Sequence, residues 1–269
     1  MKVWFITGTS RGFGREWTAA ALKRGDKVAA TARNIDSLQD LVEEYGDNIL
    51  PLALDVTDRA ADFAAVKQAH DHFGRLDVVV NNAGYGLFGT VEEVSEEEAR
   101  AQIETNVFGA LWVTQAALPY LREQGSGHIL QVSSIGGVAA FPGIGLYHAS
   151  KWALEAFSES LSSEVASFGI KVTIIEPGGF STDWNGSSAV RATENPAYDN
   201  IRNARATASV KRGDPKATSE AILKVVDAEN PPLRLLLGNF ATDYVKSLYP
   251  KRLATWAEWD DVARAADGE

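Results

Sequence analysis

The chain has 269 residues, 45% of them hydrophobic, which is enough for one large α/β domain with a buried core. Its net charge of −10 and its pI near 5.0 argue against nucleic acid or an anionic membrane surface as the main partner. Cysteine is absent, which excludes disulfides and thiolate zinc sites, and four scattered His residues without HExxH spacing argue against a catalytic metal.

The sequence shows no sign of export or of membrane anchoring. Met1 and Lys2 run directly into VWFITG without an apolar segment of signal length, and nowhere do about 18 apolar residues follow one another. No internal repeat, low-complexity tract or linker interrupts the chain. We therefore expect a single cytoplasmic domain over residues 1–269.

The chain opens with an expected strand, a glycine-rich turn and a helix. Residues 3–7 are a short run of apolar, β-branched and aromatic side chains, and a helical pattern follows over 13–24. The turn between them, TGTSRGFG, contains Gly8, Gly12 and Gly14. Backbone that approaches a pyrophosphate closely cannot carry side chains, and the helix N-terminus beyond offers amides and a positive dipole end. The turn thus indicates a dinucleotide site.

The end of the second expected strand, 27–32, bears on the choice between the two nicotinamide dinucleotides. An NAD site commonly has an acid here, which accepts from the ribose 2′-hydroxyl, whereas a 2′-phosphate needs cations. This chain has Ala32 followed by Arg33, and Arg11 lies in the glycine turn. Two guanidiniums converging on a phosphate would contribute about 1.5–3 kcal/mol per hydrogen bond. We expect NADP(H) in preference to NAD(H); the alternative is that both arginines are ordinary surface charge.

Apolar runs continue to alternate with helical patterns, with helices expected over 35–45 and 58–73 and strands over 49–54 and 76–80. This alternation indicates a parallel sheet covered by helices on both faces.

Polar residues follow two of these strands, at the edge where such sheets bind ligands. Asp55 and Val56 follow one strand, and the run NNAG at 81–84 follows the next. Asp55 is a candidate acceptor for an adenine amino group, and the Asn82 amide is a candidate tie between neighbouring strands. Ordinary turn formation is the alternative for both.

Two further helices are expected before the next strand. Ser95 begins the sequence SEEE, a capping box that opens a helix. The region 106–122 has apolar residues on more than one face, so we expect one side to pack on the sheet and another to meet a second subunit. Asn106 stands at its start, where helix capping is the ordinary role.

The stretch 131–154, QVSSIGGVAAFPGIGLYHASKWAL, joins an apolar strand to an amphipathic helix through a glycine-rich loop. It places Tyr147 and Lys151 four residues apart, on one helix face. A free tyrosine titrates near pH 10, and an ammonium at about 4 Å favours the phenolate by up to about 4 kcal/mol. We therefore expect a lowered pKa that lets Tyr147 exchange protons at neutral pH. The alternative is an ordinary solvated helix face.

The last third continues with a helix to 168, a strand over 171–176 and a turn at Pro177-Gly178-Gly179. Residues 180–212 hold no sustained period, which indicates a functional loop or lid. Asp214 and Pro215 open another helix, a last strand spans 233–237, and residues 239–269 form a helical tail with Trp256 and Trp259 one turn apart.

Taken together, these motifs resemble the compact, single-domain branch of the short-chain dehydrogenase/reductase family. The match covers about residues 3–240 in the family's order, with Ser134 thirteen residues before Tyr147. EPGGFSTDW at 176–184 resembles more particularly the hydroxysteroid- and retinol-dehydrogenase-like branch. The motifs that carry the resemblance are TGTSRGFG, Asp55-Val56, NNAG at 81–84, Asn106, Ser134, YHASK at 147–151 and Pro177-Gly178.

The resemblance implies a doubly wound, Rossmann-type α/β fold with seven parallel strands in the order 3-2-1-4-5-6-7, and a catalytic tetrad. By motif, Tyr147 is the general acid/base, and Lys151 lowers its pKa while holding the nicotinamide ribose hydroxyls. Ser134, rather than its neighbour Ser133, orients the substrate carbonyl. Asn106 holds a water that relays protons through Lys151.

The resemblance also implies a set of cofactor contacts, of which Pro177, Gly178 and Thr182 position the nicotinamide carboxamide. The full set is Gly8, Ser10, Arg11, Gly12, Phe13, Gly14, Arg33, Asp55, Val56, Asn82, Ala83, Gly84, Tyr147, Lys151, Pro177, Gly178 and Thr182.

We therefore expect an NADP(H)-dependent oxidoreductase that interconverts a ketone or aldehyde and an alcohol, assembled as a homodimer or homotetramer. A largely apolar pocket would take a substrate with a hydrophobic body, although some of its expected residues have loop packing as their alternative role. These residues are Phe141, Ile144, Leu146, Phe180 and Trp184.

Two other functions are alternatives to this one. A non-catalytic NADP(H) sensor is one alternative, but such proteins tend to lose the Tyr or the Lys, and this chain keeps both. An epimerase or dehydratase of the family's larger branch would need a different glycine spacing and a larger C-terminal substrate domain.

Overall fold

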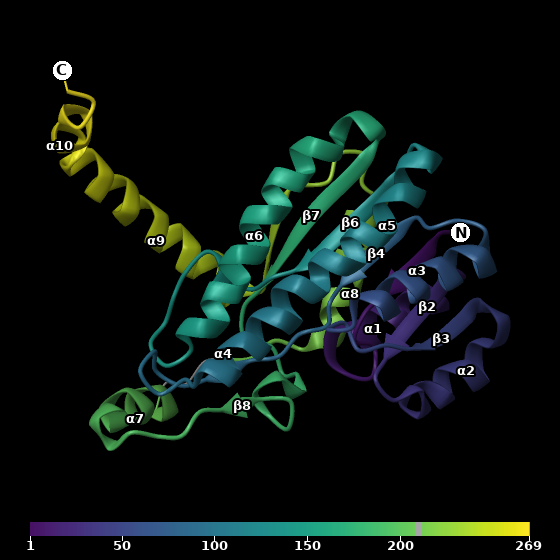
Figure 1. Cartoon of the computed structure of the whole chain (residues 1–269), viewed down its shortest axis with the longest axis horizontal. Coiled ribbons are helices and arrows are strands. Elements are labelled where there is room, and N and C mark those ends of the chain that lie inside the picture. The colour runs from purple at the N-terminus through teal and green to yellow at the C-terminus, as the bar shows by residue number, and fades with distance from the viewer. Residues whose placement is uncertain (208–210, 269) are drawn as a thin grey trace.

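Seven parallel strands form the central sheet of the computed structural model, which describes residues 1–207 and 211–268, without the side chains of 205–207. The sheet has the order β3-β2-β1-β4-β6-β7-β9, which is 3-2-1-4-5-6-7 when only its own strands are counted, as expected (Figure 1). Its strands are β1 (Val3–Ile6), β2 (Lys27–Ala32), β3 (Ile49–Ala53), β4 (Val78–Asn81), β6 (Gly127–Val132), β7 (Ile170–Pro177) and β9 (Arg234–Leu237).

Helices cover both faces of this sheet, and this explains why its strands are apolar throughout. Trp4 and Ile6 of β1 face a core shared with α1 (Gly12–Lys23), α2 (Gln39–Tyr45) and α8 (Thr218–Asp227). Val3 and Phe5 face the opposite core, shared with α3 (Arg59–Phe73), α5 (Ala110–Gln124) and α6 (Gly145–Val165). A strand buried on both sides has no polar alternation.

The capping box at Ser95 opens a helix as expected, and a second helix has a side-chain cap of its own. The Ser95 Oγ accepts from the Glu98 amide at 3.2 Å, and the Glu98 carboxylate accepts from the Ser95 amide at 2.9 Å, so the capping box opens α4 (Glu96–Ile103). The Asp58 carboxylate caps α3 with a single hydrogen bond, which it accepts from the Ala61 amide at 3.0 Å.

The expected helix start at Asn106 is wrong. A π-helical turn, Glu104–Gly109, links α4 directly to α5, and Asn106 lies inside it with 1% of its surface exposed. Its side chain therefore caps no helix. A single π-helical turn inside a helix often marks a functional position, because it displaces the regular hydrogen bonds.

The expectation of an irregular segment over 180–212 is wrong in part. This segment contains β8 (Val190–Arg191), which pairs in parallel with β5 (Leu87–Phe88), and α7 (Asp199–Thr207). α7 is short and polar, so it lacks the apolar period that would announce it. Residues 208–210 of the expected lid lie outside the described residues.

The helical tail consists of α9 (Asn239–Glu258) and α10 (Asp260–Ala265). The first turns of α9 pack on Ile135 and Val138, and the rest extends away from the body (Figure 1). Trp256 and Trp259 are 66% and 57% exposed there. Among the described helices, none is long and apolar enough to cross a membrane.

Candidate active site

The carboxyl ends of the central strands open into one cleft with a volume of about 1210 Å³. Its wall combines the glycine turn, the ends of β2, β3, β4, β6 and β7, the start of α6 and the segment after Pro177. Every residue that we expected to contact cofactor or substrate, or to act in catalysis, lines this cleft, with three exceptions: Gly14, Asn106 and Leu146.

The glycine turn is shaped by two different steric requirements. Gly8 and Gly12 have φ angles of 70° and 61°, a region that favours glycine. A Cβ on Gly12 would meet only Thr182 within 4 Å, so this backbone faces the cleft. A Cβ on Gly14 would lie 2.4 Å from the Gly8 oxygen. Gly14 is therefore needed for close packing of α1 against the turn and does not line the cleft.

Asn82 ties β4 to β1, as the sequence suggested. Its Nδ2 donates to the Thr7 and Gly8 carbonyls at 2.8 and 2.9 Å, and its backbone amide donates to the Thr7 Oγ1 at 2.9 Å. Asp55, which also lines the cleft, accepts from the Thr57 amide at 3.0 Å. Asp55 therefore has its ordinary turn role, and its contact with adenine stays a prediction.

The two arginines expected to converge on a phosphate point to different partners. Arg11 donates from Nη1 to the Asp183 carboxylate at 2.7 Å and to the Ser187 Oγ at 3.0 Å, and so holds the segment after Pro177. Arg33 is exposed at the cleft wall, and within the described part of the chain it forms no ion pair. Of these two arginines, Arg33 is the one whose guanidinium is left without an ion pair at the cleft wall.

Tyr147, Lys151 and Ser134 meet at the opposite end of the cleft. Tyr147 and Lys151 lie on the first turns of α6, each 6% exposed, and the Lys151 Nζ donates to the Val132 carbonyl at 2.8 Å. Ser134 follows β6 and accepts at its Oγ from the Gly136 amide at 3.0 Å. The fold thus brings the three side chains of the expected catalytic motif to one wall of the cleft.

The pKa of Tyr147 moves in the direction opposite to our expectation. Burial raises it to about 12, although a hydrogen bond with Ser134 acts to lower it. The Lys151 Nζ lies 5.8 Å from the centre of the Tyr147 ring and is bonded to a carbonyl, so its charge does not offset the burial. Burial also lowers the pKa of Lys151 to about 8, while the charge of Glu155 acts in the opposite direction.

Asn106 lies directly behind this wall. Its Nδ2 donates to the Tyr85 carbonyl and the Ser150 Oγ, both at 3.0 Å, and its Oδ1 accepts from the Tyr85 amide at 3.1 Å. A Cβ on Gly84 would lie 3.0 Å from the Asn106 Oδ1 and 3.7 Å from the Lys151 Nζ. Both amide hydrogens are used, so the side chain fixes the chain beside Lys151. The water relay stays a prediction.

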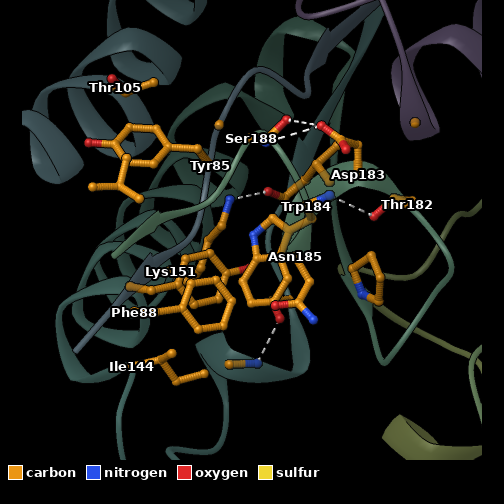
Figure 2. A pocket seen from close by; sticks show the side chains of 18 of the residues that line it. Tyr85, Phe88, Thr105, Ile144, Lys151, Thr182, Asp183, Trp184, Asn185 and Ser188 are labelled. Atoms are coloured by element: carbon orange, nitrogen blue, oxygen red, sulfur yellow. Dashed lines mark hydrogen bonds between the residues drawn. The ribbon is translucent and has the colours of Figure 1, made fainter. Parts of the chain in front are cut away.

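Aromatic and aliphatic side chains surround Tyr147. The Trp184 ring centre lies 5.0 Å from that of Tyr147 and 5.1 Å from that of Phe88, and Ile144 belongs to the same apolar cluster. Figure 2 shows Phe88, Ile144 and Trp184 among the residues that line this pocket. Leu146, by contrast, does not line the cleft, because it precedes Tyr147 by one residue and so projects about 100° around the helix.

Two of the expected substrate residues also pack against other elements. The Phe141 ring lies 5.1 Å from Tyr244 of α9, and the Phe180 ring lies 5.2 Å from Phe13 of α1. The loop-packing alternative therefore holds for both, although both also line the cleft.

Sequence reasoning missed several cleft residues, among them Phe88, His148 and Phe240. The His148 Nδ1 accepts from the Phe141 amide at 3.2 Å. Phe88 lies in a two-residue strand and Phe240 in the tail, and no motif singles out either. His148 lies within YHASK, so its position next to Tyr147 was the one available signal.

Comparison with known proteins agrees with the geometry. The family model described as short chain dehydrogenase matches residues 2–192. The chain is 44% identical over 271 residues to a Botryotinia fuckeliana (strain B05.10) protein named Oxidoreductase BOA17, covering 98% of this chain and 99% of that one.

Two solved structures extend the comparison to the fold. A short-chain dehydrogenase from Streptomyces avermitilis superposes with a TM-score of 0.93 at 42% identity, covering 99% of this chain and 100% of that one. An alcohol dehydrogenase from the archaeon Thermococcus sibiricus, complexed with 5-hydroxy-NADP, superposes with a TM-score of 0.75 at 29% identity, covering 88% and 96%. The glycine turn, the Tyr-Lys helix and these matches together place the chain in the short-chain dehydrogenase/reductase family of oxidoreductases.

Proposed function

We propose that this protein is an NADP(H)-dependent oxidoreductase that interconverts a ketone or aldehyde and an alcohol on a substrate with a hydrophobic body. The observation that carries the proposal is the joint placement of Ser134, Tyr147 and Lys151 on the wall of the cleft that also contains the glycine turn. Family membership supplies the reaction class, and the side chains of this cleft suggest the cofactor and the kind of substrate.

The cleft fits a nicotinamide dinucleotide. The Gly12 backbone faces it without a side chain, next to the N-terminus of α1, where the pyrophosphate would bind. Ala32 stands where an acid would favour NAD(H), and Arg33 offers an unpaired cation to a 2′-phosphate, while the Thermococcus sibiricus relative was solved with an NADP derivative. Pro177, Gly178 and Thr182 would hold the carboxamide.

When bound, the nicotinamide supplies the hydride that is exchanged with the substrate carbon. Tyr147 is protonated at neutral pH, because burial raises its pKa to about 12, and it would donate its proton to the oxygen of a carbonyl that is being reduced. Ser134 would hold that oxygen by a hydrogen bond. Lys151, whose Nζ lies beside Gly84, would hold the ribose hydroxyls and favour the phenolate that remains.

The substrate end of the cleft is largely apolar. Phe88, Ile144 and Trp184 surround the Tyr147 ring, and an apolar wall of this kind favours an aryl, alicyclic or long-chain carbonyl compound over a small polar one.

Turnover of a panel of carbonyl compounds tests this proposal. We expect NADPH oxidation, followed at 340 nm, with steroids, aryl ketones or aldehydes of hydrophobic body, and clearly slower oxidation of NADH with the same compounds. Binding of NADPH without turnover of any member of the panel would instead support a non-catalytic nucleotide sensor.

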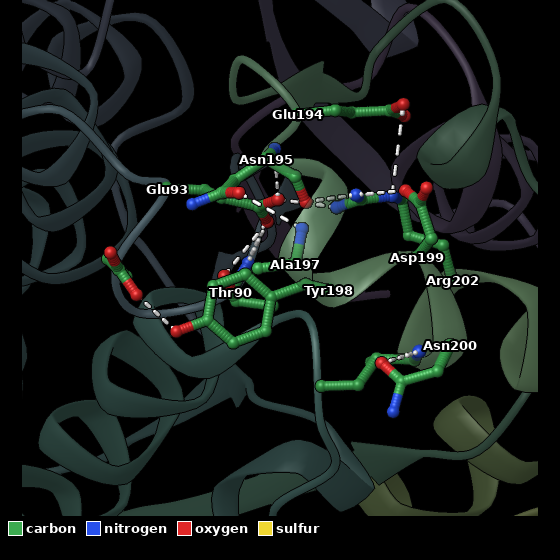
Figure 3. A network of polar contacts seen from close by, with 11 residues as sticks. Thr90, Glu93, Glu194, Asn195, Ala197, Tyr198, Asp199, Asn200 and Arg202 are labelled. Carbon is green, nitrogen blue, oxygen red and sulfur yellow. Dashed lines mark hydrogen bonds and ion pairs between the residues drawn. The ribbon is translucent and has the colours of Figure 1, made fainter.

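The segment 180–207 would serve as a lid over the substrate, and Glu93 is one of the residues that hold it. One carboxylate oxygen accepts from the Asn195 amide at 2.7 Å and pairs with Arg202; the other accepts from the Thr90 amide at 2.7 Å (Figure 3). The hydrogen bonds from these backbone amides, of which the one from Asn195 has the largest effect, lower the pKa of Glu93 to about 2. The carboxylate therefore bridges the lid and the chain before α4 whenever it is charged.

Replacing Glu93 by Gln should loosen this lid without unfolding the domain. We expect KM for the carbonyl substrate to rise roughly tenfold, the equivalent of about 1.4 kcal/mol for charged hydrogen bonds, while the KM for NADPH stays unchanged. Faster cleavage within 180–207 in limited proteolysis would accompany the kinetic change. Glu194→Gln is the matched control, since Glu194 is exposed and lies 3.8 Å from the same Arg202; equal effects from both substitutions would contradict the assignment.

We also propose a homodimer or homotetramer. Phe108 of the π-helical turn and Trp152 of α6 are 37% and 43% exposed, and their apolar surface suits a subunit contact.

A further inference from the structure

One face of α6 connects the cleft to the protein surface. Tyr147, Lys151, Glu155 and Glu159 follow one another at intervals of four residues, so their side chains lie in a row. Lys151 and Glu155 are buried, at 6% and 4% exposed, whereas the Glu159 side chain is 60% exposed. Behind the catalytic lysine, therefore, the next turn carries a buried carboxyl group.

Glu155 does not stand alone in this position. Arg234 of β9 donates from Nε to the Glu155 carboxylate at 3.0 Å and from Nη2 to the Glu159 carboxylate at 2.7 Å. The same Nε lies 3.5 Å from the carboxylate of Glu176, a β7 residue that is 2% exposed. Three elements thus hold two buried carboxyl groups against one guanidinium.

The cluster reaches the cleft through Ser133. A Cβ on Gly137 would lie 2.4 Å from the Ser133 Oγ and 2.8 Å from the Glu155 Oε1, so Gly137 leaves just enough space for these two side chains to lie together. Ser133 lines the cleft and precedes Ser134. The glycine therefore lets Glu155 approach the active-site wall from behind.

Burial and mutual repulsion oppose a full charge on both of these carboxyl groups, although Arg234 acts in the opposite direction. Burial raises the pKa of Glu176 to about 8, with the charge of Glu155 as the next cause, and burial also raises the pKa of Glu155. The pair consequently shares a proton and keeps one negative charge between its members.

We propose that Glu155 is a positioning residue for Lys151: clamped by Arg234 and paired with Glu176, it places one buried negative charge behind the lysine and keeps the ammonium protonated. The charged groups facing this region are Glu155 and Glu159 on α6, Glu176 on β7 and Arg234 on β9. Tyr147 adds a neutral phenol on the cleft side, and the groups bonded to Lys151 and Asn106 are uncharged. The inference rests on the proposed function only for the role of Lys151.

Burial works against this ammonium, so its state depends on its neighbour. Desolvation lowers the pKa of Lys151 to about 8, and the charge of Glu155 is the influence that raises it. Without that charge the lysine would lose its proton at a lower pH. A neutral lysine neither favours the phenolate of Tyr147 nor holds ribose hydroxyls as a charged donor.

The direct test is the pKa of Lys151, measured by carbon-13 NMR on protein labelled at the lysine Cε. The Lys151 signal is assigned as the one that disappears in Lys151→Met. In Glu155→Gln we expect this pKa to fall by about one pH unit, a tenfold change in the protonation equilibrium. Glu155→Asp, which keeps the charge, should restore much of the value. Glu159→Gln is the control, because it removes the exposed partner of the same arginine. An unchanged pKa in Glu155→Gln would overturn the proposal.

A second variant keeps the test decisive if Glu155→Gln does not fold. Glu176→Gln leaves Glu155 as the one buried carboxylate, so the pKa of Lys151 should rise or stay constant, and a fall would overturn the proposal.

The pH profile gives the functional readout. The alkaline limb of kcat/KM should move to lower pH in Glu155→Gln and stay in place in Glu159→Gln. If Glu155→Gln shifts the pKa of Lys151 but the wild-type protein turns over no carbonyl compound, the role of Glu155 is supported and the proposed function is wrong. If Glu155→Gln is active and the pKa of Lys151 is unchanged, the proposed function is supported and the role of Glu155 is wrong.

Discussion

Tyr147→Phe should reduce turnover roughly 10²- to 10⁴-fold, the contribution of one positioned general acid, and leave NADPH binding intact. The substitution removes only the phenolic oxygen. The ring, which packs against Phe88 and Ile144 and lies 5.0 Å from Trp184, keeps its place. Steady-state kinetics with the best carbonyl substrate, together with fluorescence titration of NADPH, measures the two effects separately.

Tyr120→Phe is the matched control for this result. Tyr120 lies on α5, stacks on His70 and has no place in the cleft, so its loss should leave turnover unchanged. If Tyr147→Phe kept most of the wild-type turnover, the proton would have to come from Ser134 or from water, and the proposed role of Tyr147 would be wrong.

Arg33→Ala should lower kcat/KM for NADPH by roughly 10- to 150-fold, because a charge-assisted bond to a phosphate contributes about 1.5–3 kcal/mol. The value for NADH should stay close to wild type, since NADH has no 2′-phosphate. Arg33 is exposed and outside any ion pair of the described chain, so its removal breaks no ion pair there. Kinetics with both cofactors, each at saturating carbonyl substrate, measure the change.

Arg11→Ala provides the comparison. Arg11 is held by Asp183 at 2.7 Å, so its approach to a phosphate would first have to break that pair, and we expect a smaller loss with NADPH. The same substitution should also weaken activity with NADH, because it releases the turn at 183–188. Equal losses with the two cofactors in Arg33→Ala, or a wild-type preference for NADH, would contradict the assignment of NADP(H).

Much of the fold was predictable because its signals are local. A strand buried on both faces is apolar at every position, as in β1 and β2, and a helix that must cover such a strand shows an apolar stripe. Glycine spacing around Gly8 and Gly14 reports a backbone approach that allows no Cβ. Ser95 marks a helix start because its side chain accepts a hydrogen bond from an amide only three residues away.

The parts of the structure that the sequence predicted wrongly depend on contacts between residues that are distant in the chain. The segment 180–207 gains its structure from bonds such as that from the Asn195 amide to Glu93, across 102 residues, and from the pairing of β8 with β5. Asn106 looked like a cap because its partners, Tyr85 and Ser150, lie 21 and 44 residues away. No pattern within a single window of the sequence contains such pairs.

The sequence by itself determined the sheet, its order, the glycine turn and the placement of Tyr147 and Lys151 on one helix face, because each follows from short-range geometry and from motif. Only the tertiary structure decided the electrostatics of those residues. Burial raises the pKa of Tyr147, the Lys151 Nζ is bonded to Val132, and a carboxyl pair at Glu155 lies behind it. Desolvation depends on everything that packs around a group, so the charge state of a site emerges only when the whole chain has folded.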